Sequence, residues 1–370
     1  MLLDWFFPYA AGVANALADE ADVIMVTRDH GLEIGASGDA VPAMRAMLDD
    51  RVRLMAIAGR QRDPGSIADV ARVRRFLCKA APDVLHVQDH ADWRLYALQR
   101  ALPCCPTILT IHDVVFHEGE SDRQGASRPL RRAVRRAVKT HAGAYIVHGR
   151  RLARLLVAQD WYGRQDVSVI PHGRLPYAAS FAPLPDAPTL LFFGRLEYYK
   201  GLDLLVKAVE LASALVPGLR VIIAGHGPDE ARCRDLVRRP ELFDWRTGFV
   251  PHGETAALFA EASVVVLPYR DASQSGIVPM AFANGRPVIA TDVGSLSEVV
   301  SDGQNGLLVR DVSPAAIADA IVRVFEEAGL LDRLASGASA TMTTGMLAPG
   351  NIALLHLRAY AQLAQRSARA

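Results

Sequence analysis

Short apolar runs alternate along this chain with longer segments whose apolar residues recur at helical spacing. Residues 22–27, 82–89 and 106–113 are runs rich in Val, Ile and Leu, and helix-like segments separate them. Strands that are apolar over most of their length, each followed by a helix, are typical of a parallel sheet covered on both faces. The pattern therefore predicts an α/β fold.

The same alternation extends over nearly the whole chain. The opening apolar run is very short, so we expect either a trimmed start or an abbreviated edge strand there. Further strands are expected at 143–149, 167–173, 189–195, 219–225, 247–250, 263–269, 287–291 and 306–309, and helices at 11–18, 66–80, 93–101, 128–141, 202–214, 229–239, 255–261 and 351–366. Repeated strand–helix units of this kind predict doubly wound sheets.

A break in the alternation divides the chain. Residues 174–188 are rich in Pro and Ala and have little periodicity, which favours a linker between domains. We predict an N-terminal Rossmann-like domain over 1–176, a C-terminal one over 177–350, and a last helix, 351–370, that returns to the first domain. Ligands of such sheets bind beyond the carboxyl ends of the strands, so we expect a cleft between the facing domains.

Composition narrows the class of protein. The chain has 370 residues, of which 51% are hydrophobic and 22% charged, with a net charge of +1. These values are ordinary for a globular protein and do not favour a nucleic-acid partner. No signal peptide and no apolar run long enough to span a membrane is expected, and the four cysteines lack zinc spacing, which favours buried thiols in the cytoplasm.

Two loops carry the chemistry expected of a phosphate site. Gly194, Arg195 and Lys200 follow a predicted buried strand, and the guanidinium and ammonium groups together suit a diphosphate. Ser275, Gly276 and Ile277 lie where a helix is expected to begin, and free backbone N–H groups there attract anions. Each loop alone is as consistent with a solvated surface, but together they predict a diphosphate clamp.

Three other features of the second half are weaker. Gly227 lies in another strand-to-helix turn, where a tight turn alone would require glycine. Phe249 and Val250 lie at a strand end, where backbone groups could hold a nucleotide base. Glu298 is the nearest carboxylate that follows the loop at 269–276.

In the first half, His112 and Asp113 come directly after a predicted strand. A histidine at that edge can hydrogen-bond a sugar or a leaving-group oxygen, and Asp113 can orient the loop. His86 lies inside a strand and is expected to be a satisfied core residue. His148 and His172, each followed by glycine, remain ambiguous between core and site.

The expected helix at 128–141 is strongly basic. Its cations are Arg128, Arg131, Arg132, Arg135, Arg136 and Lys139, with no acidic residue among them. Their spacing places them on one face of the helix. Such a face is either simply solvated or binds an anionic membrane surface or an acidic partner.

The chain resembles glycosyltransferase family 4, a family of retaining nucleotide-sugar transferases with the GT-B fold. The resemblance rests on motifs in a fixed order: FFGRLEYYKGLDLLVKA, VIIAGHGP, FAEASVVVLPY, SGIVPMAFANGRPVIATDVGSLSEVV and DGQNGLLV, preceded by TIHD and VIPHG in the first half. No single motif is specific, whereas the ordered set is, and it covers nearly the whole chain.

The resemblance implies a nucleoside-diphosphate sugar as donor, held mainly by the C-terminal domain, a glycan or lipid-linked acceptor held by the N-terminal domain, no cofactor and no metal. Arg195, Lys200 and His112 would be the catalytic residues, with His112 beside the transferred sugar. Gly12 is expected in the first strand-to-helix turn, closing on the phosphates. The donor-binding residues would be Gly12, Gly194, Gly227, Phe249, Val250, Ser275, Gly276, Ile277 and Glu298.

One departure from the family concerns sugar recognition. Many members carry two glutamates eight positions apart, and alignment on Gly285 places Ala272 and Met280 at these positions. We therefore expect a subtype without the paired donor-site glutamates. The neutral side chains of Ser273, Gln274 and Ser275, with Asp113, are the candidate sugar contacts.

We accordingly expect a metal-independent, retaining hexosyltransferase of the cytoplasm or the inner membrane surface that makes a bacterial-type polysaccharide or glycolipid. An inactive nucleotide- or glycan-binding GT-B protein is the alternative, motivated by the missing carboxylates. A nucleotide-sugar epimerase is disfavoured because the donor loop lacks an acid/base carboxylate.

Overall fold

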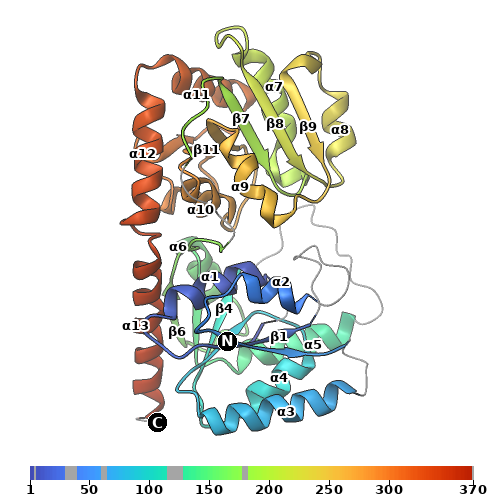
Figure 1. The fold of residues 1–370 in the computed structure, drawn as a ribbon, viewed down its shortest axis with the longest axis vertical. Helices are drawn as coiled ribbons and strands as arrows, with labels where there is room; N and C mark the ends of the chain where they lie inside the picture. The colour runs from blue at the N-terminus through green and yellow to red at the C-terminus, as the bar shows by residue number, and fades with distance from the viewer. Residues whose placement is uncertain (4–5, 30–39, 60–64, 115–127, 177–181, 369–370) are drawn as a thin grey trace. The chain divides into compact units, whose positions relative to one another are not determined.

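The structure is a computed structural model that describes all residues except 4–5, 30–39, 60–64, 115–127, 177–181 and 369–370. The chain forms two compact units (Figure 1). The first unit contains the described residues up to 176 together with 349–368, and the second contains 182–348. Both units are α/β, and every strand pairing in them is parallel.

The first unit contains two groups of parallel strands. Its strands are β1 (Ile24–Arg28), β2 (Arg53–Ile57), β3 (Leu85–Gln88), β4 (Thr107–Ile111), β5 (Ala144–Val147) and β6 (Asp166–Val169). β1 pairs with β2, and β3 to β6 form a four-stranded sheet in chain order. Leu2 bridges Val26 of β1 and Val87 of β3, so it joins the two groups in place of a full strand. The short extended segment expected at the start is therefore present, but it lies between β1 and β3 and not at an edge.

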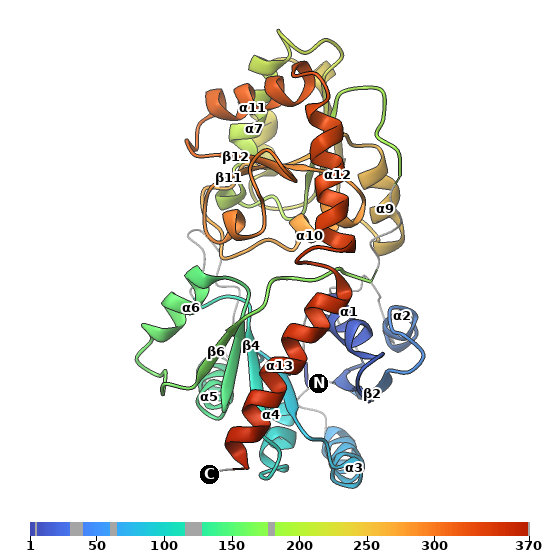
Figure 2. The same cartoon turned by 90° about the vertical axis from the view of Figure 1, so that its left-hand side faces the viewer.

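Helices cover this sheet. They are α1 (Phe7–Leu17), α2 (Val41–Ala46), α3 (Gly65–Ala80), α4 (Trp93–Arg100), α5 (Arg128–Thr140), α6 (Arg150–Val157) and α13 (Pro349–Ser367). The last of these packs Ile352, Ala359 and Leu363 against Ile108 of β4 and Ile146 of β5 (Figure 2). The C-terminal helix is therefore part of the core of the first unit.

The second unit is built around one sheet of six described strands. They are β7 (Thr189–Phe193), β8 (Arg220–Gly225), β9 (Phe243–Thr247), β10 (Val264–Leu267), β11 (Val288–Thr291) and β12 (Gly306–Val309). Their order is β12-β11-β10-β7-β8-β9. This is the Rossmann order, in which the chain reverses its direction of winding between its first strand, β7, and its fourth, β10.

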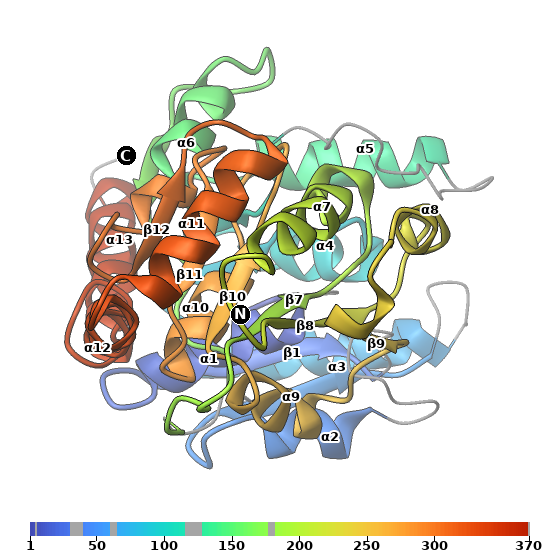
Figure 3. The same cartoon turned by 90° about the horizontal axis from the view of Figure 1, so that it is seen from above.

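The helices of this unit are α7 (Leu202–Ala212), α8 (Glu230–Asp235), α9 (His252–Ala260), α10 (Ile277–Ala283), α11 (Pro314–Glu326) and α12 (Leu330–Thr343). α7 and α11 lie side by side and share one hydrophobic core with the sheet (Figure 3). α10 packs against α12. Ser313 caps the start of α11, since its side chain accepts a hydrogen bond from the Ala316 N–H at 3.3 Å.

Several elements differ from those expected from the sequence. The prediction of a strand at 247–250 is wrong, because β9 ends at Thr247. The helix expected at 229–239 already ends at Asp235. The elements β2, α2, α6, α11 and α12 were not expected. β2 is exposed at Arg53, half-buried over the next three residues and fully buried only at Ile57, so it lacks the long buried apolar run of the strands that were predicted.

Candidate functional site

The carboxyl ends of β7 and β10 define a candidate site within the second unit. These strands are neighbours in the sheet, with Val264 opposite Leu190 and Val265 opposite Leu191. Each ends in one of the two loops that carry the predicted phosphate chemistry. In open α/β sheets ligands bind at such a point of reversal, outside the strand ends. The fold therefore brings together two loops that are about 75 residues apart in sequence.

Lys200, Gly194 and Ile277 meet at this point. A Cβ atom added to Gly194 would lie 3.1 Å from Lys200 Nζ and 3.9 Å from Ile277 Cδ1. Gly194 has φ +116°, a conformation that other residues rarely adopt. The ammonium of Lys200 also lies 5.4 Å from the ring centre of Tyr269, just past β10. The predicted clamp residues of the two loops are thus neighbours in space.

Arg195 extends from the same loop and is half exposed. Its side chain is 55% exposed, with NH1 3.9 Å from Glu197 and NH2 donating to Tyr199 Oη at 3.4 Å. Both of these contacts are long for a hydrogen bond or an ion pair. Burial and, to a smaller extent, the positive charge of Arg195 lower the pKa of Lys200 to about 8, and the negative charge of Glu197 partly offsets this shift. A bound diphosphate would relieve this unfavourable concentration of positive charge.

The third part of the predicted clamp is the start of α10. Gly276 is the residue before the helix, and the Ile277 N–H donates to Ser275 Oγ at 3.2 Å. The Ser275 hydroxyl also lies 3.4 Å from Tyr269 Oη. A phosphate bound here would replace Ser275 as the acceptor for this N–H group.

The two positions at which the family's glutamates are absent hold buried, closely packed residues. Ala272 and Met280 are only 4% and 3% exposed. Gly294 has φ +63°, and a Cβ there would come within 1.8 Å of the carbonyl oxygen of Ala272. Next to this tightly packed turn, Gln274 Oε1 is buried and has no hydrogen-bond partner among the described residues. A buried acceptor without a partner is costly, and a ligand hydroxyl would satisfy it.

Four other predicted donor residues have different surroundings. A Cβ on Gly227 would lie 2.2 Å from the carbonyl oxygen of Leu196, so close packing alone requires glycine there. Phe249 is 48% exposed and places its ring edge-on to that of His252. Val250 is half-buried beside it, and Glu298 ends a short 3-10 helix, Leu296–Glu298, where it is partly exposed.

The first unit holds a cluster of three buried histidines. His112, His148 and His172 follow the neighbouring strands β4, β5 and β6, so the parallel sheet brings them to one edge. His148 Nε2 lies 3.1 Å from His112 Nδ1. The outer nitrogens have acceptors: His112 Nε2 lies 3.0 Å from Gln88 Oε1, and His148 Nδ1 lies 2.9 Å from the carbonyl oxygen of Ile170.

The ring of Tyr9 packs against all three histidines, at 4.6 to 5.1 Å between ring centres. Burial lowers the pKa of each histidine, to about 4 for His148, and the negative charge of Asp113 partly offsets this for His112 and His148. Both ring nitrogens of His112 have partners, so a sugar hydroxyl would have to replace Gln88 or His148. Asp113 itself is exposed.

The sequence left His148 and His172 ambiguous and missed Gln88 and Tyr9. The signal that could have grouped the histidines with Gln88 is their position at or just past the carboxyl ends of successive parallel strands, and Tyr9 lies near the start of the first helix. His86, in contrast, is confirmed as a satisfied core residue, with ring nitrogens 2.7 Å from Tyr360 Oη and 2.7 Å from Thr110 Oγ1.

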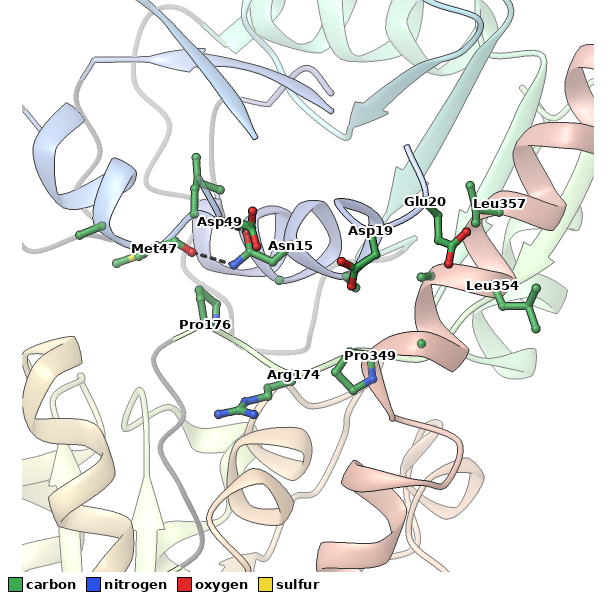
Figure 4. Close-up of a pocket in the computed structure, with 16 residues that line it drawn as sticks. Asn15, Asp19, Glu20, Met47, Asp49, Arg174, Pro176, Pro349, Leu354 and Leu357 are labelled. Atoms are coloured by element: carbon green, nitrogen blue, oxygen red, sulfur yellow. Dashed lines mark hydrogen bonds between the residues drawn. The ribbon is translucent and has the colours of Figure 1, made fainter. Parts of the chain in front are cut away.

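The expectation that Gly12 lies in a strand-to-helix turn is wrong. Gly12 lies inside α1, where a Cβ would come within 2.3 Å of the carbonyl oxygen of Arg174. It lines a cavity of about 750 Å³ in the first unit, together with Asn15, Asp49 and Arg174 (Figure 4). Asn15 holds the rim, donating to the Met47 carbonyl at 2.9 Å and accepting from the Asp49 N–H at 2.8 Å.

The expectation of a basic helix without acidic partners is wrong for two of its cations. Arg135 and Lys139 form ion pairs with Asp89, at 3.3 and 3.5 Å. Asp89 directly follows β3, so a contact between distant parts of the chain supplies the charge. Arg132 and Arg136 are exposed, Arg131 is partly buried, and the side chain of Arg128 lies outside the described residues.

Two further expectations from the sequence concern the cysteines and membrane-spanning helices. The four cysteines are free, but only Cys233 is buried and Cys78 and Cys104 are exposed, so the expectation of buried thiols is wrong for these two. Among the described residues, no helix combines the length and the apolar character needed to cross a membrane.

Two models of protein families match the chain. Residues 8–173 match a model described as "Glycosyl transferase 4-like domain", and residues 187–327 match one described as "Glycosyl transferases group 1". The chain is also 37% identical over 171 residues to a D-inositol 3-phosphate glycosyltransferase of Nocardioides sp., a match that covers 41% of this chain and 37% of the relative. Glycogen synthase of Mycobacterium tuberculosis is 30% identical over 192 residues, covering 49% of this chain and 45% of the relative. The chain therefore spans less than half the length of each of these two relatives.

Solved structures show the same fold over almost the entire chain. Sucrose-phosphate synthase from Thermosynechococcus elongatus has a TM-score of 0.68 at 20% identity, covering 96% of this chain and 92% of that protein. The Anabaena protein HepE, solved with UDP-glucose, has a TM-score of 0.66 at 16% identity and covers 100% of this chain and 98% of that protein.

Proposed function

The chain belongs to the glycosyltransferase family 4 type of proteins with the GT-B fold, and from this premise we propose that it transfers a sugar from a nucleoside-diphosphate sugar to a hydroxyl group of an acceptor. The observation that carries the proposal is the meeting of Lys200, Gly194 and Ile277 at the point of reversal of the second sheet. The cations available there, Lys200 and Arg195, match the charge that a diphosphate brings and the charge that develops when it leaves.

The proposed transfer exchanges one bond for another. The bond between the sugar C1 and the terminal phosphate oxygen breaks, and the acceptor oxygen bonds to C1 while its proton passes to the leaving phosphate. Lys200 and Arg195 stabilise the negative charge on the departing diphosphate without a metal ion. Attack from the face that the diphosphate leaves gives retention of configuration, and His112 is the proposed contact to the transferred sugar.

Sugar hydroxyls are proposed to be held by neutral groups. Gln274 Oε1 is a buried acceptor that a hydroxyl would satisfy, and Ser273 is its neighbour. Ala272 and Met280 cannot contribute, because both side chains are apolar and packed inside the unit.

The test is turnover with a panel of nucleotide sugars. UDP-glucose is the first donor to use, since it is bound in the structure of HepE. Release of the nucleoside diphosphate is measured with and without glycan and lipid-linked acceptors, and binding of free nucleoside diphosphates is measured by calorimetry. We expect both binding and acceptor-dependent release, and failure to bind any nucleoside diphosphate would refute the proposal.

Two other outcomes separate the alternatives. Binding without turnover under all acceptors identifies a non-catalytic nucleotide- or glycan-binding protein, which the absence of the paired glutamates favours. Conversion of the donor sugar with no acceptor present identifies an epimerase.

We also propose that the acceptor is a glycan or a lipid-linked sugar and that α5 approaches an anionic membrane surface. Arg132, Arg136 and Leu130 support the second point, because the two cations are exposed and the Leu130 side chain is 63% exposed beside them. Cations near an anionic surface each contribute about 1 kcal/mol to binding.

A further inference from the structure

We propose that His112, His148 and His172 bind a divalent transition-metal ion of the zinc class. One nitrogen from each ring lies within 4.8 Å of one nitrogen from each of the others. All three side chains are buried, with 2%, 2% and 4% exposure. This site would belong to the first unit and is separate from the diphosphate clamp, whose residues belong to the second unit. The ion would occupy His112 Nδ1, so the sugar contact proposed for His112 would have to be made by Nε2 in place of Gln88.

The hydrogen bonds around His112 and His148 direct one lone pair of each ring inward. The Ile170 carbonyl can only accept, so His148 Nδ1 carries the hydrogen, and the neutral ring then has its lone pair on Nε2. Gln88 Oε1 likewise calls for a hydrogen on His112 Nε2, which leaves the lone pair on Nδ1. The two lone pairs then face each other at 3.1 Å, an arrangement that repels unless a positive charge lies between them.

A proton is a poor solution to this conflict, because burial disfavours an imidazolium. A metal ion satisfies both lone pairs at once. Two nitrogens 3.1 Å apart can both reach a Zn²⁺ ion at the usual Zn–N distance of about 2.0–2.1 Å. The acceptors on the outer nitrogens, a backbone carbonyl and a side-chain amide, are the partners that ligating histidines typically have.

His172 supplies an independent observation. Only 4% of this residue is exposed, and neither Nδ1 nor Nε2 has a hydrogen-bond partner among the described residues. Reversing the Gln88 amide would turn the His112–His148 contact into an ordinary hydrogen bond, but it would leave His172 unsatisfied. Its ring centre lies 4.1 Å from that of His148 and 5.7 Å from that of His112, so a small rotation brings a nitrogen to the same ion.

The ligand set identifies the class of metal. Three neutral imidazoles suit Zn²⁺, Co²⁺, Ni²⁺ or Cu²⁺, whereas Mg²⁺ and Ca²⁺ require oxygen ligands. Tyr9 covers the cluster with its ring, which excludes water from part of the site. Asp113, next to His112, contributes a negative charge that offsets part of the charge of the ion.

The test uses the full chain, stripped of metal with a chelator. Zn²⁺ is titrated in competition with a chromophoric chelator, and Co²⁺ is titrated while its visible absorption is recorded. We expect one ion per chain and the intense visible bands of four-coordinate Co²⁺. His172→Gln and His148→Gln should each weaken binding on the order of 100-fold or more, and Gln88→Leu, which removes a positioning residue, about 10- to 100-fold.

His141→Gln is the matched control, since His141 is an exposed histidine of the same unit. It should leave metal binding unchanged. If a cluster variant does not fold, the wild-type protein alone still tests the proposal. Zn²⁺ should raise its Tm, and the chelator should reverse that rise. Uptake of no ion at micromolar metal, uptake that survives His172→Gln, or uptake lost in His141→Gln would each overturn the proposal.

Discussion

Lys200 Nζ lies 3.1 Å from the point where a methyl group on Gly194 would stand. We therefore predict that Gly194→Ala displaces the ammonium and weakens binding of a nucleoside diphosphate at least 10-fold. The substitution also places alanine at φ +116°, at a cost of about 1–2 kcal/mol in the free energy of unfolding. Gly218→Ala is the control, because Gly218 has φ +75° and only Pro188 Cδ near its Cβ position. Equal loss of nucleotide binding in both variants would contradict the prediction.

Arg195 is predicted to act on the leaving group. Arg195→Ala should lower kcat by about 10²–10³-fold, because a preorganised charge facing the transition state is removed. Its effect on the free energy of unfolding should be small, since the side chain is 55% exposed. The measurement is steady-state kinetics with the donor identified in the panel. Arg323→Ala, on the surface of α11, should change neither quantity, and a similar kcat in the Arg195 and Arg323 variants would exclude the catalytic role.

Binding of nucleotide should depend on pH through Lys200. Its pKa is about 8, so the ammonium loses its proton as pH rises through that value, and affinity for a nucleoside diphosphate should fall between pH 7.5 and 9.5. Lys200→Arg should abolish this dependence, because guanidinium remains charged. Calorimetry across the pH range makes the comparison, and parallel profiles for the two proteins would rule out Lys200 as the titrating group.

The same shift affects stability with a definite sign. The pKa of Lys200 is lowered from the 10.5 of an unperturbed lysine, so between about pH 8 and 10.5 the unfolded chain holds more protons than the folded one. The contribution of this group to the free energy of unfolding therefore rises with pH in that window. Subtracting the stability profile of Lys200→Arg from that of the wild type isolates the effect of this residue.

Arg286 is predicted to be essential for the stability of the second unit. It is fully buried, and its guanidinium donates to the carbonyl oxygens of Phe259, Ala182, Pro183 and Ala260 at 2.8 to 3.1 Å. Arg286→Met would remove the guanidinium hydrogen bonds from all four carbonyl oxygens and should lower the free energy of unfolding by about 3 kcal/mol or more. Urea unfolding measures this. Arg246→Met, which removes exposed ion pairs to Asp244 and Glu261, should cost less than about 1 kcal/mol.

The exposed cations of α5 should control binding to anionic vesicles. The double variant Arg132→Gln/Arg136→Gln is expected to weaken association on the order of 10- to 30-fold, since each cation contributes about 1 kcal/mol. Co-sedimentation with vesicles that contain anionic lipid measures the effect. Arg135→Gln should weaken binding less, because Arg135 already pairs with Asp89. Vesicle binding that is insensitive to the double variant would assign the helix to ordinary solvation.

Most strands and helices of the fold could be predicted from local patterns of apolar residues. Runs such as residues 107–111 and 264–267 are buried throughout because both faces of the sheet are covered, and their ends could be predicted closely. β2 and α6 were missed, since β2 is half exposed over most of its length and α6 is short and strongly charged. The two loops of the proposed diphosphate clamp could be singled out because glycine and cations after a strand have a local signature.

The histidine cluster and the partner of α5 could not be predicted in the same way. Each histidine alone is consistent with a core residue, and only the order of β4, β5 and β6 in the sheet makes them neighbours. Asp89 and Lys139 are likewise 50 residues apart, and sequence spacing gives no measure of their distance. Met280 shows the opposite case, in which an apolar residue at a functional position of the family is explained by its packing.

The position of α13 determines the order in which the two units can be completed during synthesis. Tyr360, in this last helix, hydrogen-bonds His86 of β3, and Ile352 packs on the sheet that the first residues begin. The ribosome has therefore made every described residue of the second unit before the first unit receives its final helix. A nascent chain released before Pro349 would contain all described residues of the second unit, with one face of the first sheet still open to chaperones.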